Sequence, residues 1–133
     1  MKWKNLGRIF NPLNYSRHHN LQTHASNPTV YKIDNKKVRV FYSGRDNKNR
    51  SSIGAFDFCL KNKKIINYYI DPLFEFGPKN SFYQDGVSVS SIIKIENQIY
   101  LYFMGWQAPK NSHWRGDIGR VKLCLNTNKI SNP

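Results

Sequence analysis

Two aspartates and a set of cationic, amide and aromatic side chains are the residues in this sequence that could do chemistry on a ligand. Asp46 and Asp85 are the candidate catalytic carboxylates, and the candidate substrate-binding residues are His24, Asn27, Arg45, Arg50, Trp106 and Arg115. Carboxyl groups can exchange protons with a glycosidic oxygen, guanidinium groups bind hydroxyls or an anionic substituent, and a tryptophan packs on a sugar ring. The set suits a glycan or oligosaccharide, and hydrolysis would need carboxyl groups about 5 to 9.5 Å apart.

Each candidate also has a structural interpretation, and the sequence alone leaves both open. Asp46 could form a salt-bridged turn with the arginines beside it, and Asp85 could be an ordinary turn residue before a glycine. Trp106 could be a core residue at a strand end, and His24 could cap a turn. These alternatives are decided by where the strands place each side chain.

No metal site and no cofactor are expected. His18 and His19 are adjacent, so we expect their rings to point in different directions, and no third ligand has suitable spacing. Cys59 and Cys124 are too far apart for a metal knuckle and are predicted to be small buried residues. The sequence also lacks a phosphate-binding glycine motif and a nucleophile elbow.

An internal repeat organises the strands that must position these residues. Residues 53–60 (IGAFDFCL) match residues 118–125 (IGRVKLCL) at an offset of 65 residues, which is 118 − 53. Residues 32–35 (KIDN) match residues 94–97 (KIEN) at an offset of 62, which is 94 − 32. A repeated unit with one variable loop produces such a drift, and that loop must follow the second strand of each unit.

Each unit is predicted to form four antiparallel strands, because short runs of β-branched and aromatic residues alternate with polar turns. No helical periodicity is present. We predict an all-β chain forming about two blades of a β-propeller of four-stranded antiparallel sheets, with a two-sheet sandwich as the competing architecture. The single partial domain, 1–133, divides into an N-terminal segment (1–23), a first blade (24–76) and a second blade (77–133) truncated before its last strand. Remaining blades, from the same gene or another chain, are expected as partners for closure.

The strand directions place the candidate residues at one end of the predicted sheets. In an antiparallel unit, the start of the first strand and the loop between the second and third strands lie at the same end, and every candidate falls in such a segment. The opposite end carries the hairpins at residues 34–37, 61–64, 96–98 and 126–129, which together hold much of the lysine excess. The net charge of +13 requires an anionic partner to be considered. Lysines at hairpin tips ordinarily keep strand ends solvated and no recognition motif is present, so no nucleic-acid partner is predicted.

The composition argues against a membrane protein. The chain has 39% hydrophobic residues, enough for a core, but no stretch approaches the roughly 20 apolar residues of a membrane-spanning helix. The basic N-terminus is not followed by the apolar run of a signal peptide. We therefore expect a cytoplasmic protein with no membrane partner.

Five motifs resemble the opening third of the five-bladed propeller glycosidase-like proteins. They are HASNPTV (24–30), VFYSGRD (40–46), NRSSIG (49–54), FYQDGVSVS (82–90) and YLYFMGW (100–106). This group includes arabinanases, invertases, levansucrases and β-mannoside phosphorylases, with glycosylase-like members among bacterial surface-polysaccharide genes. The resemblance covers nearly the whole chain and implies an incomplete five-bladed propeller.

The resemblance implies glycoside hydrolysis or transfer, with carboxylates on the inner strands of the first three blades. Asn27 stands at the first of these positions and cannot act as a base, Asp85 falls close to the second, and the third blade is missing. Tyr83 and Gln84 stand where acidic residues are common in the group. We expect the N-terminal fragment of a glycoside hydrolase-like protein that acts on a glycan, with surface polysaccharide metabolism as a candidate role. The fragment alone is expected to be inactive. The alternatives are a non-catalytic glycan-binding propeller and a nonfunctional truncated product.

Overall fold

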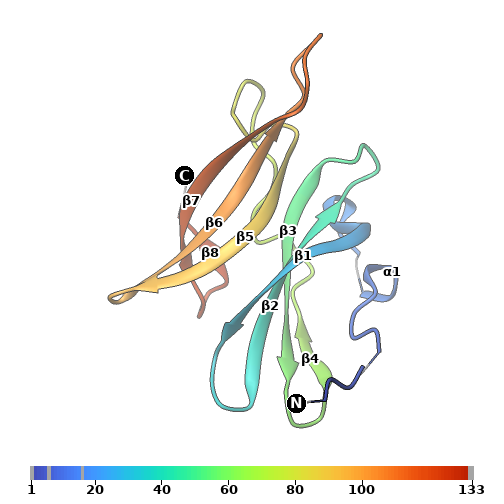
Figure 1. The fold of residues 1–133 in the computed structure, drawn as a ribbon, viewed down its shortest axis with the longest axis vertical. Helices are drawn as coiled ribbons and strands as arrows, with labels where there is room; N and C mark the ends of the chain where they lie inside the picture. Colours follow the sequence, from blue (N-terminus) through green and yellow to red (C-terminus); the bar gives the residue numbers. More distant parts are fainter. Residues whose placement is uncertain (1, 6, 16, 132–133) are drawn as a thin grey trace.

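Eight strands form two antiparallel meanders that lie side by side (Figure 1) in a computed structural model describing residues 2–5, 7–15 and 17–131. The first meander contains β1 (Thr23–Lys32), β2 (Lys37–Arg45), β3 (Ser51–Cys59) and β4 (Lys64–Tyr68). The second contains β5 (Gly86–Ile95), β6 (Gln98–Gln107), β7 (Arg115–Cys124) and β8 (Lys129–Ile130). Within each meander, neighbouring strands pair in chain order. The all-β prediction and the prediction of four-stranded antiparallel units are therefore confirmed.

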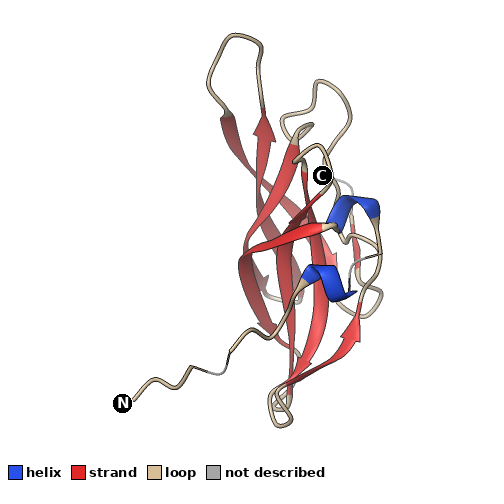
Figure 2. Ribbon diagram, turned by 90° about the vertical axis from the view of Figure 1, so that its right-hand side faces the viewer, coloured by secondary structure: helices blue, strands red, loops and turns tan. Residues whose placement is uncertain are grey.

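The two meanders join in one open sheet through a single parallel pair, Ser51 on β3 with Gly86 on β5. This open sheet is not a closed propeller. Two short helices, α1 (Pro12–Tyr15) and η1 (His19–Leu21), lie against one side of the strands (Figure 2). The N-terminal segment and the end of the second unit include positions outside the described residues, namely 1, 6, 16, 132 and 133.

The sequence repeat appears in the structure as equivalent cross-strand pairs. Tyr42 on β2 pairs with Gly54 on β3, and Phe103 on β6 pairs with Gly119 on β7. A Cβ atom added at Gly54 would lie 2.6 Å from the Tyr42 ring, and one at Gly119 would lie 2.2 Å from the Phe103 ring. In both units the glycine leaves room for an aromatic ring of the neighbouring strand. The predicted variable loop is confirmed, since the β2–β3 loop covers residues 46–50 and the β6–β7 loop covers residues 108–114.

Two hydrophobic clusters hold the fold together. The larger one fills the space between the meanders and includes Phe41, Ile53, Phe74 and Phe103. The smaller one lies on the other face of the first meander, where Leu21 and Phe10 of the N-terminal segment pack on it. Its other buried members are Val38, Val40, Tyr42, Phe56 and Phe58. Burial of the apolar side chains in these two clusters is the main favourable contribution to folding.

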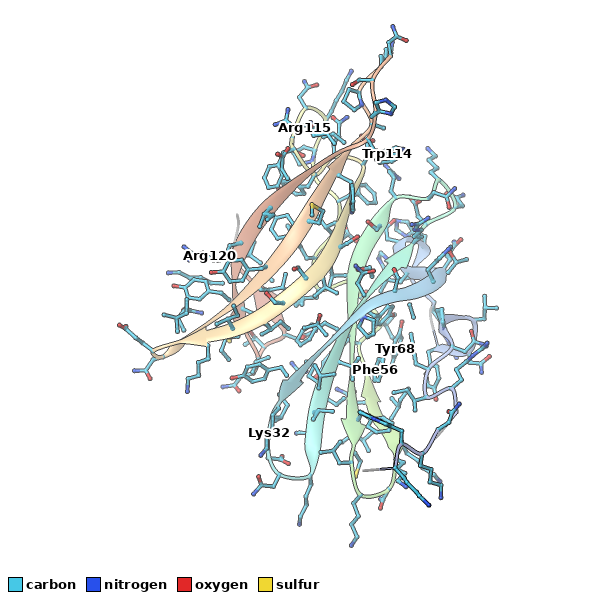
Figure 3. The ribbon with its side chains drawn as sticks, viewed as in Figure 1. Lys32, Phe56, Tyr68, Trp114, Arg115 and Arg120 are labelled. Atoms are coloured by element: carbon cyan, nitrogen blue, oxygen red, sulfur yellow. The ribbon has the colours of Figure 1, made fainter. Side chains whose placement is uncertain are left out.

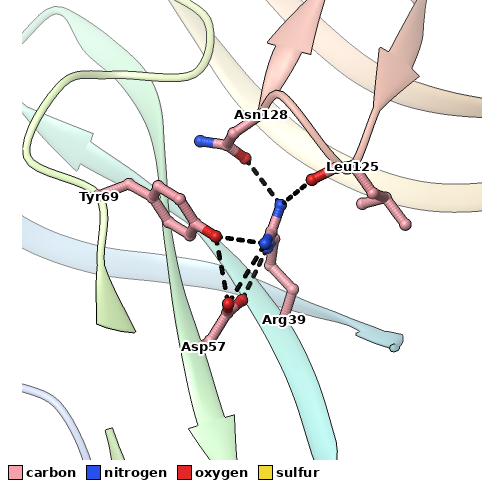
Figure 4. Close-up of polar contacts among 5 residues, drawn as sticks. All are labelled: Arg39, Asp57, Tyr69, Leu125 and Asn128. Atoms are coloured by element: carbon pink, nitrogen blue, oxygen red, sulfur yellow. Dashed lines mark hydrogen bonds and ion pairs between the residues drawn. The ribbon is translucent and has the colours of Figure 1, made fainter. Parts of the chain in front are cut away.

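A buried arginine, ion-paired within the first meander, links the two meanders at the hairpin end (Figure 4). Arg39 on β2 donates from Nε to Asp57 Oδ1 on β3 at 2.7 Å, and both side chains are 7% exposed. The same guanidinium donates to the Tyr69 hydroxyl, to the Leu125 carbonyl oxygen at 2.8 Å and to Asn128 Oδ1 at 3.2 Å. Since Leu125 and Asn128 belong to the β7–β8 turn, this charge holds the second meander against the first.

Three sequence predictions are corrected by the structure. The last strand of the second unit was expected to be missing, but β8 begins it and pairs with β7 at Cys124 and Leu123. Cys59 and Cys124 were predicted to be buried, yet Cys59, the last residue of β3, is partly exposed and Cys124, on the uncovered face of β7, is exposed. The adjacent His18 and His19 do not point apart, since their rings stack at a centroid distance of 4.4 Å.

The structure shows no cluster of three or more potential metal ligands among the described residues. Within the same residues, no helix has the length and apolar character needed to cross a membrane.

Candidate functional site

A polar pocket of about 480 Å³ lies at the end of the sheet where β1 begins and the β2–β3 and β6–β7 loops meet. Trp114 and Arg115 mark this end in Figure 3, and Lys32 marks the opposite, hairpin end. The pocket is lined by Ser26, Asn27, Arg45, Asn49, Ser51, Asp85, Ser88, Trp106 and Trp114. Both meanders contribute to it, so the site exists only where the two units are joined.

Irregular backbone in β1 shapes one wall of the pocket. The pairing of β1 with β2 shifts between Thr23 and Ser26 and again between Ser26 and Thr29. Asn27, within the second shift, has a left-handed backbone with φ of 52°. Asparagine tolerates this conformation better than most residues, and bulges of this kind commonly redirect side chains beside functional sites.

The junction of β3 and β5 forms the floor. Gly86 has φ of 154° and pairs with Ser51 in parallel. A Cβ atom at Gly86 would lie 2.5 Å from Ser51 Oγ and 2.9 Å from Ser51 N, so a side chain there would separate the two strands. Glycine is therefore required directly after Asp85, and it keeps that aspartate beside the junction of the two meanders.

Asp85 presents a partly exposed carboxylate to the pocket. Its Oδ2 accepts hydrogen bonds from Ala108 N at 2.8 Å and Gln84 Nε2 at 3.1 Å, while its own backbone N donates to the Trp106 carbonyl oxygen. Within the described part of the chain, Oδ1 has no hydrogen-bond partner. One oxygen thus fixes the side chain, and the other is available to a ligand.

Two tryptophans supply the aromatic surface. Trp106 at the end of β6 donates from Nε1 to Ser88 Oγ at 3.0 Å, which fixes the indole ring. Trp114 in the β6–β7 loop meets it edge to face, with ring centroids 6.5 Å apart, and is 62% exposed. An exposed indole beside a fixed one offers a ligand an apolar plane next to hydrogen-bonding groups.

Asp46 has a different environment from Asp85. It is 5% exposed, and its Oδ1 accepts hydrogen bonds from Lys48 N and Arg50 N, each at 2.8 Å. Its Oδ2 accepts from Arg50 Nε at 2.9 Å, and the Arg50 guanidinium lies over the Phe76 ring at 3.8 Å. Both carboxylate oxygens therefore hold the β2–β3 loop in shape.

The pocket brings together half of the predicted site residues. Asn27, Arg45, Asp85 and Trp106 line it. The other four, which do not line it, are His24, Asp46, Arg50 and Arg115. Of these, His24 is exposed, with Nδ1 2.9 Å from Thr23 Oγ1, and Arg115 pairs with Asp117 at 2.7 Å.

Five lining residues were not among the candidate site residues, namely Ser26, Asn49, Ser51, Ser88 and Trp114, although the strand directions do place Trp114 at this end of the sheet. Ser26 and Ser88 stand 62 residues apart, the offset of the repeat in this region, so the repeat could have identified them as a pair. Trp114 is the last residue of the β6–β7 loop and directly precedes the predicted Arg115, with which β7 begins. Ser51 has no signal of its own, because its place depends on the junction between the meanders.

Comparison with known proteins finds relatives without an assigned activity. No family model matches the chain, and no solved structure matches it. Two uncharacterized proteins of Mycobacterium tuberculosis are similar, Rv1502 of strain H37Rv and MT1551 of strain CDC 1551. Each is 36% identical over 123 residues, covering 90% of this chain and 40% of the relative. The chain thus spans about 40% of the length of the curated relatives it matches.

Proposed function

We propose that this chain forms part of a β-propeller of the glycosidase-like type and that its pocket binds a glycan. The observation that carries the proposal is the lining of the pocket, where a carboxylate (Asp85), a guanidinium (Arg45) and two indole rings converge with serine and asparagine side chains. Glycan sites combine such hydrogen-bonding groups with aromatic planes.

The uncovered face of the second meander supports the propeller. Ile53 and Ala55 on β3 are buried against the second meander, whereas their repeat equivalents on β7, Ile118 and Arg120, are exposed. Arg120, labelled in Figure 3, lies on this exposed face with its guanidinium 4.6 Å from the centre of the Tyr100 ring. In our proposal a further meander packs against this face, as the second packs against the first. The greater length of the curated relatives is consistent with further meanders.

In a hydrolytic version of this proposal, Asp85 is the catalytic carboxylate that this chain supplies. It is the single carboxylate among the described lining residues, so hydrolysis would require a second carboxyl group from another part of the complete propeller. Asp46 has a structural role in this proposal, because both of its carboxylate oxygens accept hydrogen bonds within the β2–β3 loop.

A non-catalytic glycan-binding propeller is the second candidate. Asn27 favours it, because this residue lines the pocket at the position where the glycosidase-like group is expected to carry a carboxylate. An amide binds sugar hydroxyls but cannot act as a base at neutral pH.

Binding of oligosaccharides to the full chain, followed by tryptophan fluorescence, tests the proposal. Trp106→Ala and Trp114→Ala should each weaken binding by roughly 2- to 10-fold, the effect of losing one aromatic contact. Trp3→Ala is the matched control, because Trp3 is 95% exposed and does not line the pocket. Failure of the wild-type chain to bind any member of a broad glycan panel would contradict the proposal.

The same samples, tested for released reducing sugar with and without the rest of the propeller, separate the two candidates. Turnover by the complete protein that disappears in Asp85→Asn identifies Asp85 as catalytic. Binding without turnover, unchanged in Asp85→Asn, identifies a binding module instead.

A further inference from the structure

We infer that the glycan of this pocket carries an anionic group, a carboxylate or a phosphate, and that Arg45 binds it. The inference rests on the proposed glycan site and names its substrate class. Arg45 ends β2 and extends into the pocket lining between the two meanders.

Arg45 differs from the other arginine beside Asp46. Arg50 forms an ion pair with Asp46 at 2.9 Å, and the two backbone N–H groups of the loop take the other carboxylate oxygen. Asp46 therefore has no capacity left for Arg45, although the two residues are adjacent in the chain. Among the described residues, the Arg45 guanidinium has no hydrogen bond and no ion pair.

Asp85 does not neutralise Arg45 either. It lines the same pocket, but no oxygen of Asp85 lies within 4.0 Å of the Arg45 guanidinium, and its Oδ2 is held by Ala108 N and Gln84 Nε2. The pocket thus presents an unpaired cation and a separate carboxylate.

The surroundings of Arg45 suit an anion on a sugar. Arg45 is partly buried, which strengthens its attraction for an opposite charge compared with that of a fully solvated arginine. A guanidinium binds a carboxylate or phosphate through two parallel hydrogen bonds, and Asn27 and Asn49 add neutral amide donors to the lining. A pocket of about 480 Å³ with two indoles is much larger than one ion needs, so the anion is a substituent on a larger ligand.

Asp85 then restricts how the ligand is oriented. An anionic group placed beside Asp85 would be repelled, whereas hydroxyl groups there can donate to its Oδ1. The charged substituent therefore binds at Arg45 and the neutral part of the sugar faces Asp85.

The test compares pairs of oligosaccharides that differ only in charge. One pair is a uronic-acid tetrasaccharide and its carboxyl-reduced neutral form, and the other is a phosphorylated oligosaccharide and its dephosphorylated form. The wild-type chain should bind the acidic member of at least one pair roughly 10- to 100-fold more tightly, the effect expected for hydrogen bonds to a charged group. The pair that shows the difference identifies carboxylate or phosphate as the recognised group.

Variants of Arg45 assign the preference to this side chain. Arg45→Gln should remove the preference for the acidic member, so that the two members of a pair bind with similar affinity, and Arg45→Lys should restore part of the preference, because charge returns without the bidentate geometry. Arg120→Gln is the matched control, since it removes the same charge from the exposed outer face of β7, away from the pocket lining.

The outcomes separate this inference from the proposed function. Equal wild-type affinity for both members of each pair, or an Arg45→Gln variant that keeps the acidic preference, overturns the inference and leaves the glycan site intact. Absence of binding to every neutral and acidic member overturns both.

Discussion

The central strands of the first meander, β2 and β3, are covered on both faces, whereas those of the second, β6 and β7, are covered on one. Residues 38–44 of β2 are all buried, but on β6 only alternate residues such as Leu101 and Phe103 are. The contrast is sharpest at equivalent positions of the repeat, since Ile53 is fully buried and Ile118 is 77% exposed. Two strands with matching sequences therefore differ in burial according to what packs against them.

The N-terminal segment accounts for the difference. Phe10 of this segment packs on Tyr42 at a ring-centroid distance of 4.8 Å, and Phe74, which follows the first meander, packs on Phe103, the repeat equivalent of Tyr42, also at 4.8 Å. The Tyr42 face of the first meander is therefore covered by the N-terminal segment. The equivalent Phe103 face of the second meander is covered by the first meander and the segment that follows it. The repeat specifies strands and cross-strand pairs, and the neighbouring layer decides which of their faces become core.

Removing Arg39, which pairs with Asp57 inside the first meander and bonds to the β7–β8 turn of the second, should have the largest effect. Arg39→Ala leaves Asp57 buried and unpaired, so we expect it to lower the free energy of unfolding by about 3 to 5 kcal/mol. Lys122→Ala is the control, because Lys122 is the exposed repeat equivalent of Asp57, and its loss should change stability by less than about 0.5 kcal/mol. Urea denaturation measures both values. A loss below about 1 kcal/mol in Arg39→Ala would show that these contacts of Arg39 do not stabilise the fold.

The equivalent isoleucines should give the next largest difference. Ile53→Ala opens a cavity between the meanders and should cost about 2 to 5 kcal/mol, whereas Ile118→Ala on the exposed face should cost less than about 0.5 kcal/mol. The difference between their urea midpoints, at equal denaturant slopes, measures the asymmetry. Similar losses in both variants would mean that the face of β7 is covered in solution.

The sequence predicted the strands well because alternation and turn residues are local signals. The repeat at residues 53–60 and 118–125 placed β3 and β7 in equivalent positions, and the strand directions placed Asn27, Asp85 and Trp106 at one end. These predictions needed only the periodicity of a strand and the geometry of a meander.

Properties that depend on neighbouring layers or loop conformation were beyond the sequence. Arg45 is the chain neighbour of Asp46, yet it is Arg50, four residues on, that pairs with the carboxylate across a loop with a left-handed residue at Asn49. The exposure of Cys124 likewise depends on the open face of β7, which no repeat of the sequence reveals.

The smallest expected effect is a pH dependence of the free energy of unfolding. It arises from Tyr42 in the first meander and has no counterpart at Phe103, the equivalent position of the second. Burial, together with a hydrogen bond to the Tyr68 hydroxyl, raises the pKa of Tyr42 far above its ordinary value of 10.0, whereas Phe103 carries no titratable group. Above about pH 10 the unfolded chain loses the Tyr42 proton and the folded chain keeps it, so stability is fully present below that pH and falls as the pH rises. Tyr42→Phe should therefore lose less stability than the wild type between about pH 9 and 11.

Thermal unfolding midpoints at pH 7 and at alkaline pH measure this effect. At pH 7 the Tyr42 hydroxyl is protonated in the folded and unfolded states, so the comparison there reports the lost hydrogen bond with Tyr68, about 0.5 to 1.5 kcal/mol. The Tyr42→Phe variant keeps a second source of alkaline sensitivity at Tyr69, whose pKa is also raised by burial, so the substitution should reduce the pH slope without abolishing it. Identical slopes in the two proteins would show that the N-terminal segment does not keep water from Tyr42, and would remove the distinction between the two meanders at this face.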